Sequence, residues 1–457
     1  MKTRLACLAA ALVLAPLVLA SPLLAQSREF PATLVGHALV PAHRMIVPPA
    51  DAPPGFAVSG RFTGPGGTRT EAIGSLPQRT GITLPFVGQP LQGFSGIKPV
   101  GDGSYWVLTD NGFGTKRNSP DALLFISRVT PDWQGGGVAV HQHVFLSDPN
   151  RLVPFRIENE HTRERYLTGA DFDPESIQPV ADGFWIGEEF GPFLFHVDRQ
   201  GRVTGVYPTL SGGQEVRSPD HPALQLGPDP TRAVPYAVQR SGGYEGMAMS
   251  PDGASLYALL EKPMFDAAGK PETADGRRFL RIFEFSTARR AWTGRELRFA
   301  LEEGATAIGD FNMIDARRAL IIERDDGEGD PSMACAAGTQ PAPDNRCFAN
   351  PARFKRIVLV DLQATDAQGF VRRIGHIDLM AIRDPQNRAR FKGEARRDLA
   401  GIFTFPFFTI ENVAMVDAEH IIVANDNNLP FSIGRFVDRA ADNEFILLRV
   451  PELLQAR

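Results

Sequence analysis

Three glutamates of this sequence share one setting. Glu175, Glu245 and Glu411 each stand at the start of an apolar run and precede a small or amide residue, in "DPESIQPV", "YEGMAMSP" and "IENVAMVD". Carboxylate and amide oxygens are hard ligands, of which Ca²⁺ takes about six to eight. Together these carboxylates could hold a divalent cation, and one of them could act as the base that activates water. We predict catalytic and metal-binding roles for all three; the alternative is that each glutamate staples backbone N–H groups of a neighbouring sheet.

Further acids follow each glutamate at the end of a second apolar run. A tight-turn sequence such as "ADG" or "SPDG" separates the two runs, so each copy is expected to be a β-hairpin that returns both ends to one edge of the sheet. The predicted metal ligands are therefore Glu175, Glu245, Glu411, Asn412, Asp110, Glu188, Glu261 and Asp426.

The acids need a compensating charge, because carboxylates that are brought together in a partly buried funnel repel one another. A cation, bound protons or basic side chains could supply it. Lys98, Lys262 and Arg324 lie inside or just after the repeated stretches and are predicted to bind a phosphate-bearing substrate. The alternative for each is a solvated charge. Gly246, next to Glu245, would let the backbone approach a bound ion or substrate.

The repeated hairpin predicts the fold. Five copies begin near residues 95, 176, 246, 312 and 412, at intervals of roughly 65 to 100 residues, which is typical of the blades of a β-propeller. The chain has 457 residues, of which 44 are glycine and 37 proline, which favours an all-β chain with many turns. We expect six blades, the sixth formed by 444–450 together with strands around 55–63; five or seven blades are the alternatives.

The N-terminus predicts export. Residues 1–25 combine a basic start at Lys2 and Arg4 with an apolar stretch and small residues before the predicted cleavage after Ala25, as in a secretory signal peptide. The alternative is a membrane anchor. Residues 26–457 are then one propeller domain, located in the periplasm or secreted, and no later segment is apolar enough to span a bilayer. The net charge of −5 gives no reason to expect nucleic acid as a partner.

Two cysteines remain after the leader. Cys335 and Cys347 close a short Pro/Gly-containing loop, and in an oxidising compartment they are expected to form a disulfide. The fold prediction is therefore a propeller with a disulfide-closed loop insertion.

Taken together, the "FDPESI", "GEEFGP", "YEGMAMSPDG" and "IENVA" stretches resemble the family called esterase-like activity of phytase. The resemblance runs over roughly 86–450 and implies exported β-propellers that hydrolyse phosphate or carboxyl esters. The first interpretation is a Ca²⁺-dependent hydrolase of a small-molecule phosphate ester. A lactonase or carboxyl esterase is a close variant, since gluconolactonase-like propellers use a similar calcium funnel, and Glu175, Glu245, Asn312 and Asn412 would suit it. The third is a non-catalytic propeller that binds a ligand or protein and holds structural calcium.

Overall fold

The structure is a computed structural model that describes residues 27–63, 72–73, 80–224, 236–339, 346–391 and 400–457. The predicted signal peptide, residues 1–25, lies outside them. The regular secondary structure of the described chain is almost entirely β, as predicted, with one short α-helix, α1 (Pro451–Gln455), and two 3₁₀ turns, η1 (Pro54–Ala57) and η2 (Pro331–Met333). No helix of the described part is long and apolar enough to cross a bilayer.

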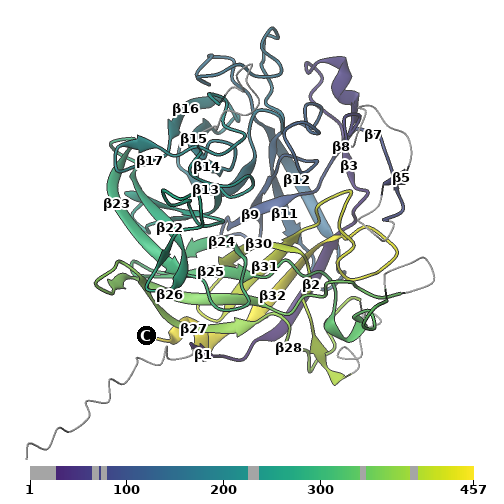
Figure 1. Cartoon of the computed structure of the whole chain (residues 1–457). Helices are drawn as coiled ribbons and strands as arrows, with labels where there is room; N and C mark the ends of the chain where they lie inside the picture. The colour runs from purple at the N-terminus through teal and green to yellow at the C-terminus, as the bar shows by residue number, and fades with distance from the viewer. Residues whose placement is uncertain (1–26, 64–71, 74–79, 225–235, 340–345, 392–399) are drawn as a thin grey trace, which may run out of the picture.

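Five antiparallel sheets form the body of the molecule (Figure 1). The first two blades are β9 (Phe94–Pro99), β10 (Tyr105–Thr109), β11 (Phe125–Pro131) and β12 (Val138–Phe145), then β13 (Pro174–Val180), β14 (Gly183–Glu188), β15 (Phe193–Asp198) and β16 (Val203–Pro208). The third and fourth are β19 (Tyr244–Met249), β20 (Ser255–Leu260), β22 (Arg277–Ser286) and β23 (Ala291–Ala300), then β24 (Ala307–Met313), β25 (Arg318–Arg324), β26 (Lys355–Thr365) and β27 (Val371–Asp378). The fifth contains β30 (Thr409–Met415), β31 (His420–Asp426), β32 (Asn443–Arg449) and β2 (Thr33–Val40).

Short strands extend these sheets or pair beside them. Those that extend blades are β1 (Arg28–Glu29), β21 (Thr273–Ala274), β28 (Ile382–Arg383) and β29 (Ile402–Phe403). The others pair in twos: β3 (Met45–Ile46) with β8 (Gln89–Pro90), β4 (Val58–Ser59) with β7 (Phe86–Val87), β5 (Ala72–Ile73) with β6 (Ile82–Thr83), and β17 (Leu210–Ser211) with β18 (Gln214–Glu215).

The innermost strands form a closed ring. Each contacts the next in the order β9, β13, β19, β24 and β30, and β30 contacts β9 again. These strands begin the five hairpins predicted from the sequence, so the repeat identified the inner strands correctly. The described residues therefore form a five-bladed propeller.

The expectation of a sixth blade was wrong. Residues 444–449 fall in β32, which pairs with β31 on one side and with β2 on the other, from Thr33 opposite Arg449 to Val40 opposite Asn443. Residues 55–63 instead hold part of η1 and the short β4, outside the blades. The terminal strands complete the fifth blade, and the described strands left outside the five blades form only short two-stranded pairs.

Glycines let the inner strands approach one another closely. A Cβ atom at Gly309 would lie 1.8 Å from the carbonyl oxygen of Ile410 in the next blade, and one at Gly246 would lie 2.7 Å from Cβ of Phe311. The interpretation of Gly246 as a place where an ion or substrate approaches was therefore wrong, because the fourth blade occupies that space.

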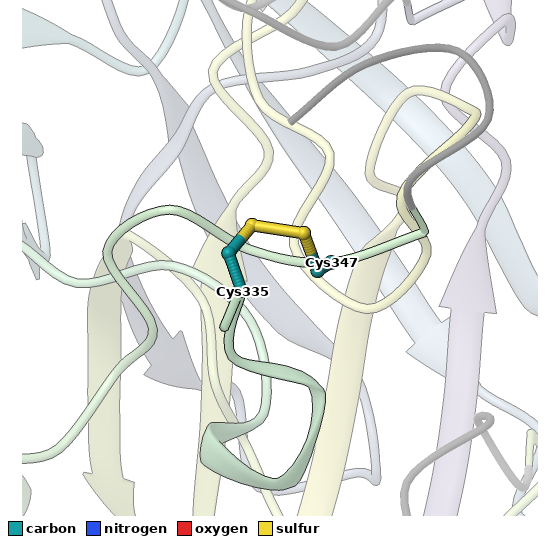
Figure 2. The surroundings of a disulfide bond; sticks show 2 residues. All are labelled: Cys335 and Cys347. Carbon is teal, nitrogen blue, oxygen red and sulfur yellow. A yellow bond between two sulfur atoms is a disulfide. The ribbon is translucent and has the colours of Figure 1, made fainter. Parts of the chain in front are cut away.

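The predicted disulfide is present in the loop between β25 and β26 (Figure 2). Cys335 and Cys347 are bonded with an S–S distance of 2.06 Å and a sequence separation of 12. Phe348, next to the second cysteine, packs with Ile433 and Val437 of the segment before β32. The disulfide-closed insertion is thus anchored on the fifth blade.

Candidate functional site

A β-bulge places each of the three glutamates. In β13, Pro174 pairs with Glu188 and Ser176 with Gly187, which leaves Glu175 as the extra residue between two consecutive pairs. Glu245 in β19 and Glu411 in β30 are extra residues in the same way. A bulge re-aims the side chain of the extra residue. Three inner strands therefore present a carboxylate at equivalent positions.

The other two inner strands carry different residues at their bulges. The bulge of β9 contains Ser95, and that of β24 contains Gly309 and Asp310. The Ser95 hydroxyl donates to Oε2 of Glu411 at 2.9 Å. The ring is therefore chemically asymmetric, with a glutamate at the bulge of the second, third and fifth blades.

The glutamates open onto a cavity of about 320 Å³ at one end of the ring. Its lining contains nine carboxylates and two basic side chains. The acids are Asp110, Asp173, Glu175, Glu189, Glu245, Glu261, Asp326, Glu411 and Asp426, and the bases are Lys262 and Arg324. If every group were ionised, negative charges in the described lining would exceed positive ones by seven.

Glu175, Glu245 and Glu411 converge within this cavity. One oxygen from each lies within 4.8 Å of those from the other two, and the residues are only 7%, 3% and 5% exposed. Burial, and then the neighbouring carboxylates, raise the pKa of Glu175 and Glu245 well above the usual range. Burial, with Asp426 beside it, raises the pKa of Glu411 to about 8. The uncharged forms are favoured unless a cation binds.

Asp173 and Glu189 were not among the predicted ligands, yet they join the site. One oxygen from each also lies within 4.8 Å of an oxygen of Glu175. Asn111 orients Asp173, since its backbone N–H donates to Oδ1 at 3.2 Å and its side-chain amide donates to Oδ2 at 2.7 Å. Both acids lie in the quoted motifs, two residues before Glu175 and directly after Glu188. Their nearness in sequence to the repeated acids could have identified them as candidate ligands.

The basic side chains of the cavity both contact Glu261. Nη2 of Arg324 donates to Oε1 of Glu261 at 2.8 Å, and Nζ of Lys262 lies 3.0 Å from Oε2. Nη2 of Arg324 is also 4.0 Å from Oε1 of Glu411. Burial alone would lower the pKa of Arg324 and of Lys262, but the adjacent carboxylates raise both. Both side chains are therefore cationic, and Glu261 is an ion-pair partner.

Asp110 and Asp426, both predicted ligands, also line the cavity. Oδ1 of Asp110 accepts from the N–H of Gly112 at 2.8 Å, and Oδ1 of Asp426 accepts from the N–H of Asn428 at 2.8 Å. Burial raises the pKa of Asp110 well above its usual range and that of Asp426 to about 6. Backbone contacts thus fix the orientation of both carboxylates.

Lys98, predicted to bind substrate, does not line the cavity. It lies three residues beyond Ser95 on β9, about 10 Å further along the strand. There its ammonium donates to Oδ1 of Asn312, whose amide donates to Asp310 at 3.0 Å. Burial lowers the pKa of Lys98 to about 8, although Asp310 opposes the shift. Lys98 and Asn312 belong to a polar cluster inside the ring.

Glu188 and Asn412, predicted as ligands, also lie outside the cavity lining. The Glu188 carboxylate accepts three backbone N–H groups of the β14–β15 loop, including those of Gly191 and Phe193 at 2.7 Å. Asn412 donates to the carbonyl of Phe94 and accepts from the N–H of Gly96 at 3.2 Å. Glu188 closes a loop, and Asn412 joins the fifth blade to the first.

The donor set fits a divalent cation such as Ca²⁺. Oxygens that bind one Ca²⁺ lie about 2.3–2.6 Å from the ion, so two of them are at most about 5 Å apart. The convergent oxygens of Glu175, Glu245 and Glu411 meet this limit. Oε1 of Glu245 is buried and has no hydrogen-bond partner among the described residues. An unpaired buried carboxylate oxygen is costly, and a cation would satisfy it.

Comparison with known proteins adds a family. The family model described as "Phytase-like: Esterase-like activity of phytase" matches residues 89–429, which include all five inner strands. No curated protein sequence matches the chain significantly.

Solved structures give distant likenesses. A periplasmic gluconolactonase of Pseudomonas aeruginosa is 13% identical, covers 78% of this chain and 88% of that chain, and has a TM-score of 0.30. A native arabinanase of Bacillus subtilis is 10% identical over 78% of this chain and 92% of that chain, with a TM-score of 0.34. A luciferin-regenerating enzyme is 9% identical over 80% of this chain and 94% of that chain, with a TM-score of 0.32. Likenesses this distant carry no argument about activity.

Proposed function

The chain belongs to the Phytase-like family, and from this membership and the acidic cavity we propose that it is an exported, divalent-cation-dependent hydrolase of phosphate esters. The observation that carries the proposal is the convergence of Glu175, Glu245 and Glu411, whose oxygens meet within 4.8 Å in a polar cavity. Export rests on the leader-like sequence of residues 1–25.

The three glutamates would hold the cation, with Ca²⁺ as the expected ion. When bound, such an ion polarises a phosphoryl oxygen and lowers the pKa of water. Asp426, on the wall beside Glu411, is our choice of general base. Burial raises its pKa to about 6, near the range in which a carboxylate accepts a proton at neutral pH. Its Oδ1 accepts from the N–H of Asn428 at 2.8 Å, whereas its Oδ2 has only a long contact of 3.4 Å from the Thr409 hydroxyl, so Oδ2 would be the proton acceptor.

Arg324 and Lys262 are the groups of the described lining that would face phosphate oxygens. Both are already paired with Glu261, so an incoming phosphate would share them with that carboxylate. Carboxylates that ionise in the cation-free cavity would repel a phosphate. The cation is therefore expected to support substrate binding as well as chemistry.

A lactonase or carboxyl esterase is the second candidate, and one observation favours it. Lys98 lies outside the cavity, and both basic groups in the described lining are engaged by Glu261. A neutral ester would need no further positive charge. The same cation and base would then act on a carbonyl carbon instead of phosphorus.

A substrate screen separates these candidates. Purified protein, stripped with EDTA and reloaded with Ca²⁺, would be assayed on p-nitrophenyl phosphate, bis-p-nitrophenyl phosphate, a gluconolactone and p-nitrophenyl acetate. We expect hydrolysis of a phosphate ester that disappears with EDTA and returns with Ca²⁺. Hydrolysis of the uncharged esters alone would favour the second candidate. Ca²⁺ binding with no hydrolysis of any ester would favour a non-catalytic binding propeller, and activity unaffected by EDTA would contradict the proposal.

A further inference from the structure

We propose that the cavity holds two divalent cations, with Glu175 as the carboxylate shared between them. One cation would be bound by Glu175, Glu245 and Glu411, as the proposed function requires. The second would be bound by Asp173, Glu175 and Glu189. The inference rests on the proposed cation dependence and deepens it by adding a site and a shared ligand.

The carboxylates fall into two sets. Within each set, one oxygen per residue lies within 4.8 Å of the other two, and Glu175 is the residue that the two sets have in common. Glu175 has two carboxylate oxygens, so it can serve both sets. Asp173 and Glu189 belong to the second blade and its loop, whereas Glu245 and Glu411 come from the third and fifth blades. A single ion would therefore leave one set unfilled.

Each set also contains its own unpaired oxygen. Oε1 of Glu189 and Oε1 of Glu245 are buried and lack a hydrogen-bond partner among the described residues. The two residues are 5% and 3% exposed, and both line the cavity. Glu189 belongs only to the second set and Glu245 only to the first. The need for a bound ligand thus arises twice, independently.

Backbone and amide contacts hold the second set in place. Asn111 donates to both carboxylate oxygens of Asp173, and the N–H of Glu189 donates to the carbonyl of Asp173 at 3.0 Å. Gly243 packs against the other side of Glu189, where a Cβ atom would lie 2.5 Å from Cα of Glu189. Such outer contacts orient metal ligands before the ion binds. The second set has this support without any contribution from the first.

The charge of the cavity favours a second cation. If every group of the described lining were ionised, the seven excess negative charges would fall to five with one divalent ion and to three with two. Lys262 offsets part of the charge near Glu189, but its ion pair is with Glu261 at 3.0 Å. Protons shared between carboxyl groups are the competing explanation, and they would leave the second set without a metal.

A pair of cations with a shared carboxylate suits phosphate esters. Two metal ions can stabilise the attacking and the leaving oxygen of an in-line displacement at phosphorus. The ions would also supply the positive charge that Arg324 and Lys262 share with Glu261. The inference therefore points to phosphate esters over lactones as the substrate class.

Counting bound ions tests this inference without any assay of activity. The full chain would be stripped with EDTA and titrated with Ca²⁺, and bound ions counted by native mass spectrometry and calorimetry. We expect two ions per chain for the wild type, one for Glu189→Gln and one for Glu411→Gln. In Glu175→Gln both affinities should fall at least about tenfold. Asp326→Asn is the matched control, because Asp326 lines the same cavity, is 51% exposed and belongs to neither set, so it should keep two ions.

One ion in the wild type would overturn the inference, and so would two in Glu189→Gln. If Glu189→Gln does not fold, Asp173→Asn replaces it as the variant that removes a ligand of the second cation. The number of ions bound to the wild type tests the inference without any variant. Two ions without phosphate-ester hydrolysis would keep this inference and reject the proposed function. One bound ion together with EDTA-sensitive hydrolysis of a phosphate ester would reject this inference and keep the proposed function.

Discussion

Arg324 of the fourth blade and Glu261 of the third form an ion pair across the cavity wall, with Nη2 2.8 Å from Oε1 and side chains only 4% and 5% exposed. Lys262 occupies the other oxygen of Glu261. Because Arg324 also lies near Glu411, it moderates the repulsion between acids from different blades. The pair therefore links the stability of the ring to the charge of the cavity.

Replacing Arg324 with Ala should lower the free energy of unfolding by about 3 kcal/mol, since it leaves the buried Glu261 carboxylate with Lys262 as its remaining partner. Denaturant unfolding in EDTA would measure the loss. The control is Arg449→Ala, which breaks the exposed pair with Glu419, where both side chains are about half exposed. That change should cost less than about 1 kcal/mol. Equal effects of the two substitutions would contradict the role given to Arg324.

Replacing Glu245 with Gln should weaken Ca²⁺ binding and any hydrolysis at least about tenfold, roughly 1.4 kcal/mol. Folding should survive, because one fewer carboxylate reduces repulsion among the rest. Calorimetric titration and thermal unfolding would measure the two effects, with the exposed Glu303→Gln as the control. A Glu245→Gln protein that binds Ca²⁺ normally but melts earlier would show that the residue is a structural staple.

The cation-free protein should lose stability as the pH rises. Burial raises the pKa of Glu411 from its usual 4.5 to about 8, so the folded state binds more protons than the unfolded state between these values. The resulting stabilisation is complete below about pH 4.5 and is lost as the pH passes through about 8. We expect the melting temperature in EDTA to fall by roughly 5 °C or more from about pH 5 to about pH 9.

Saturating Ca²⁺ should reduce or reverse this slope, because the ion binds the ionised carboxylates and its affinity rises with pH. Calorimetric scans with and without Ca²⁺ at each pH would measure both slopes. A melting temperature in EDTA that climbs from about pH 5 to about pH 9 would rule out raised pKa values in the cavity.

Replacing both Cys335 and Cys347 with Ser should cost about 3 kcal/mol at most, because the bond closes a loop with a sequence separation of only 12. The number of bound Ca²⁺ ions should not change, since neither cysteine lines the cavity. Thermal unfolding of the double variant and of the reduced wild type would measure the loss. Two free thiols in the wild-type protein recovered from the periplasm would contradict the bond.

Replacing Asn412 with Ala should destabilise the ring and leave the cation count unchanged. The substitution removes the side-chain contacts with the carbonyl of Phe94 and the N–H of Gly96, and unpaired buried backbone groups cost about 1–3 kcal/mol. Denaturant unfolding and native mass spectrometry on the same variant would separate the two effects. Loss of a bound ion with unchanged stability would restore Asn412 to the ligand set.

The inner hairpins could be predicted from sequence because the residues that specify each hairpin are close together in the chain. Alternating apolar residues and turn signals mark each of the five copies, and a hairpin brings its two ends to one edge, so the chemistry of Glu245 and Glu261 could be placed at one rim. The blade count could not be read in this way. The strand Thr33–Val40 looks like any strand, and its partner Asn443–Arg449 is a matter of long-range pairing.

The site residues, too, could be predicted where local sequence patterns place them and could not where long-range packing decides their contacts. The bulge glutamates and the predicted hairpin-exit residues other than Glu188 reached the cavity. Lys98 did not, because it lies three residues beyond Ser95 on β9. Glu188 and Asn412 have the chemistry of ligands but are occupied by backbone groups. Hydrogen-bond competition of this kind depends on the packed loop and on the neighbouring blade, which local patterns do not encode.

The pairing of β2 with β32 has a consequence for the order of folding. It joins the beginning of the described chain to its end, so the ring closes only after the last blade has been synthesised. Contacts between such distant segments carry a high entropic cost of loop closure and form late. The acids of the second, third and fifth blades meet only within the closed ring. A chain that crossed a membrane unfolded would thus remain chemically inert during synthesis and acquire its cation-binding centre only at its destination.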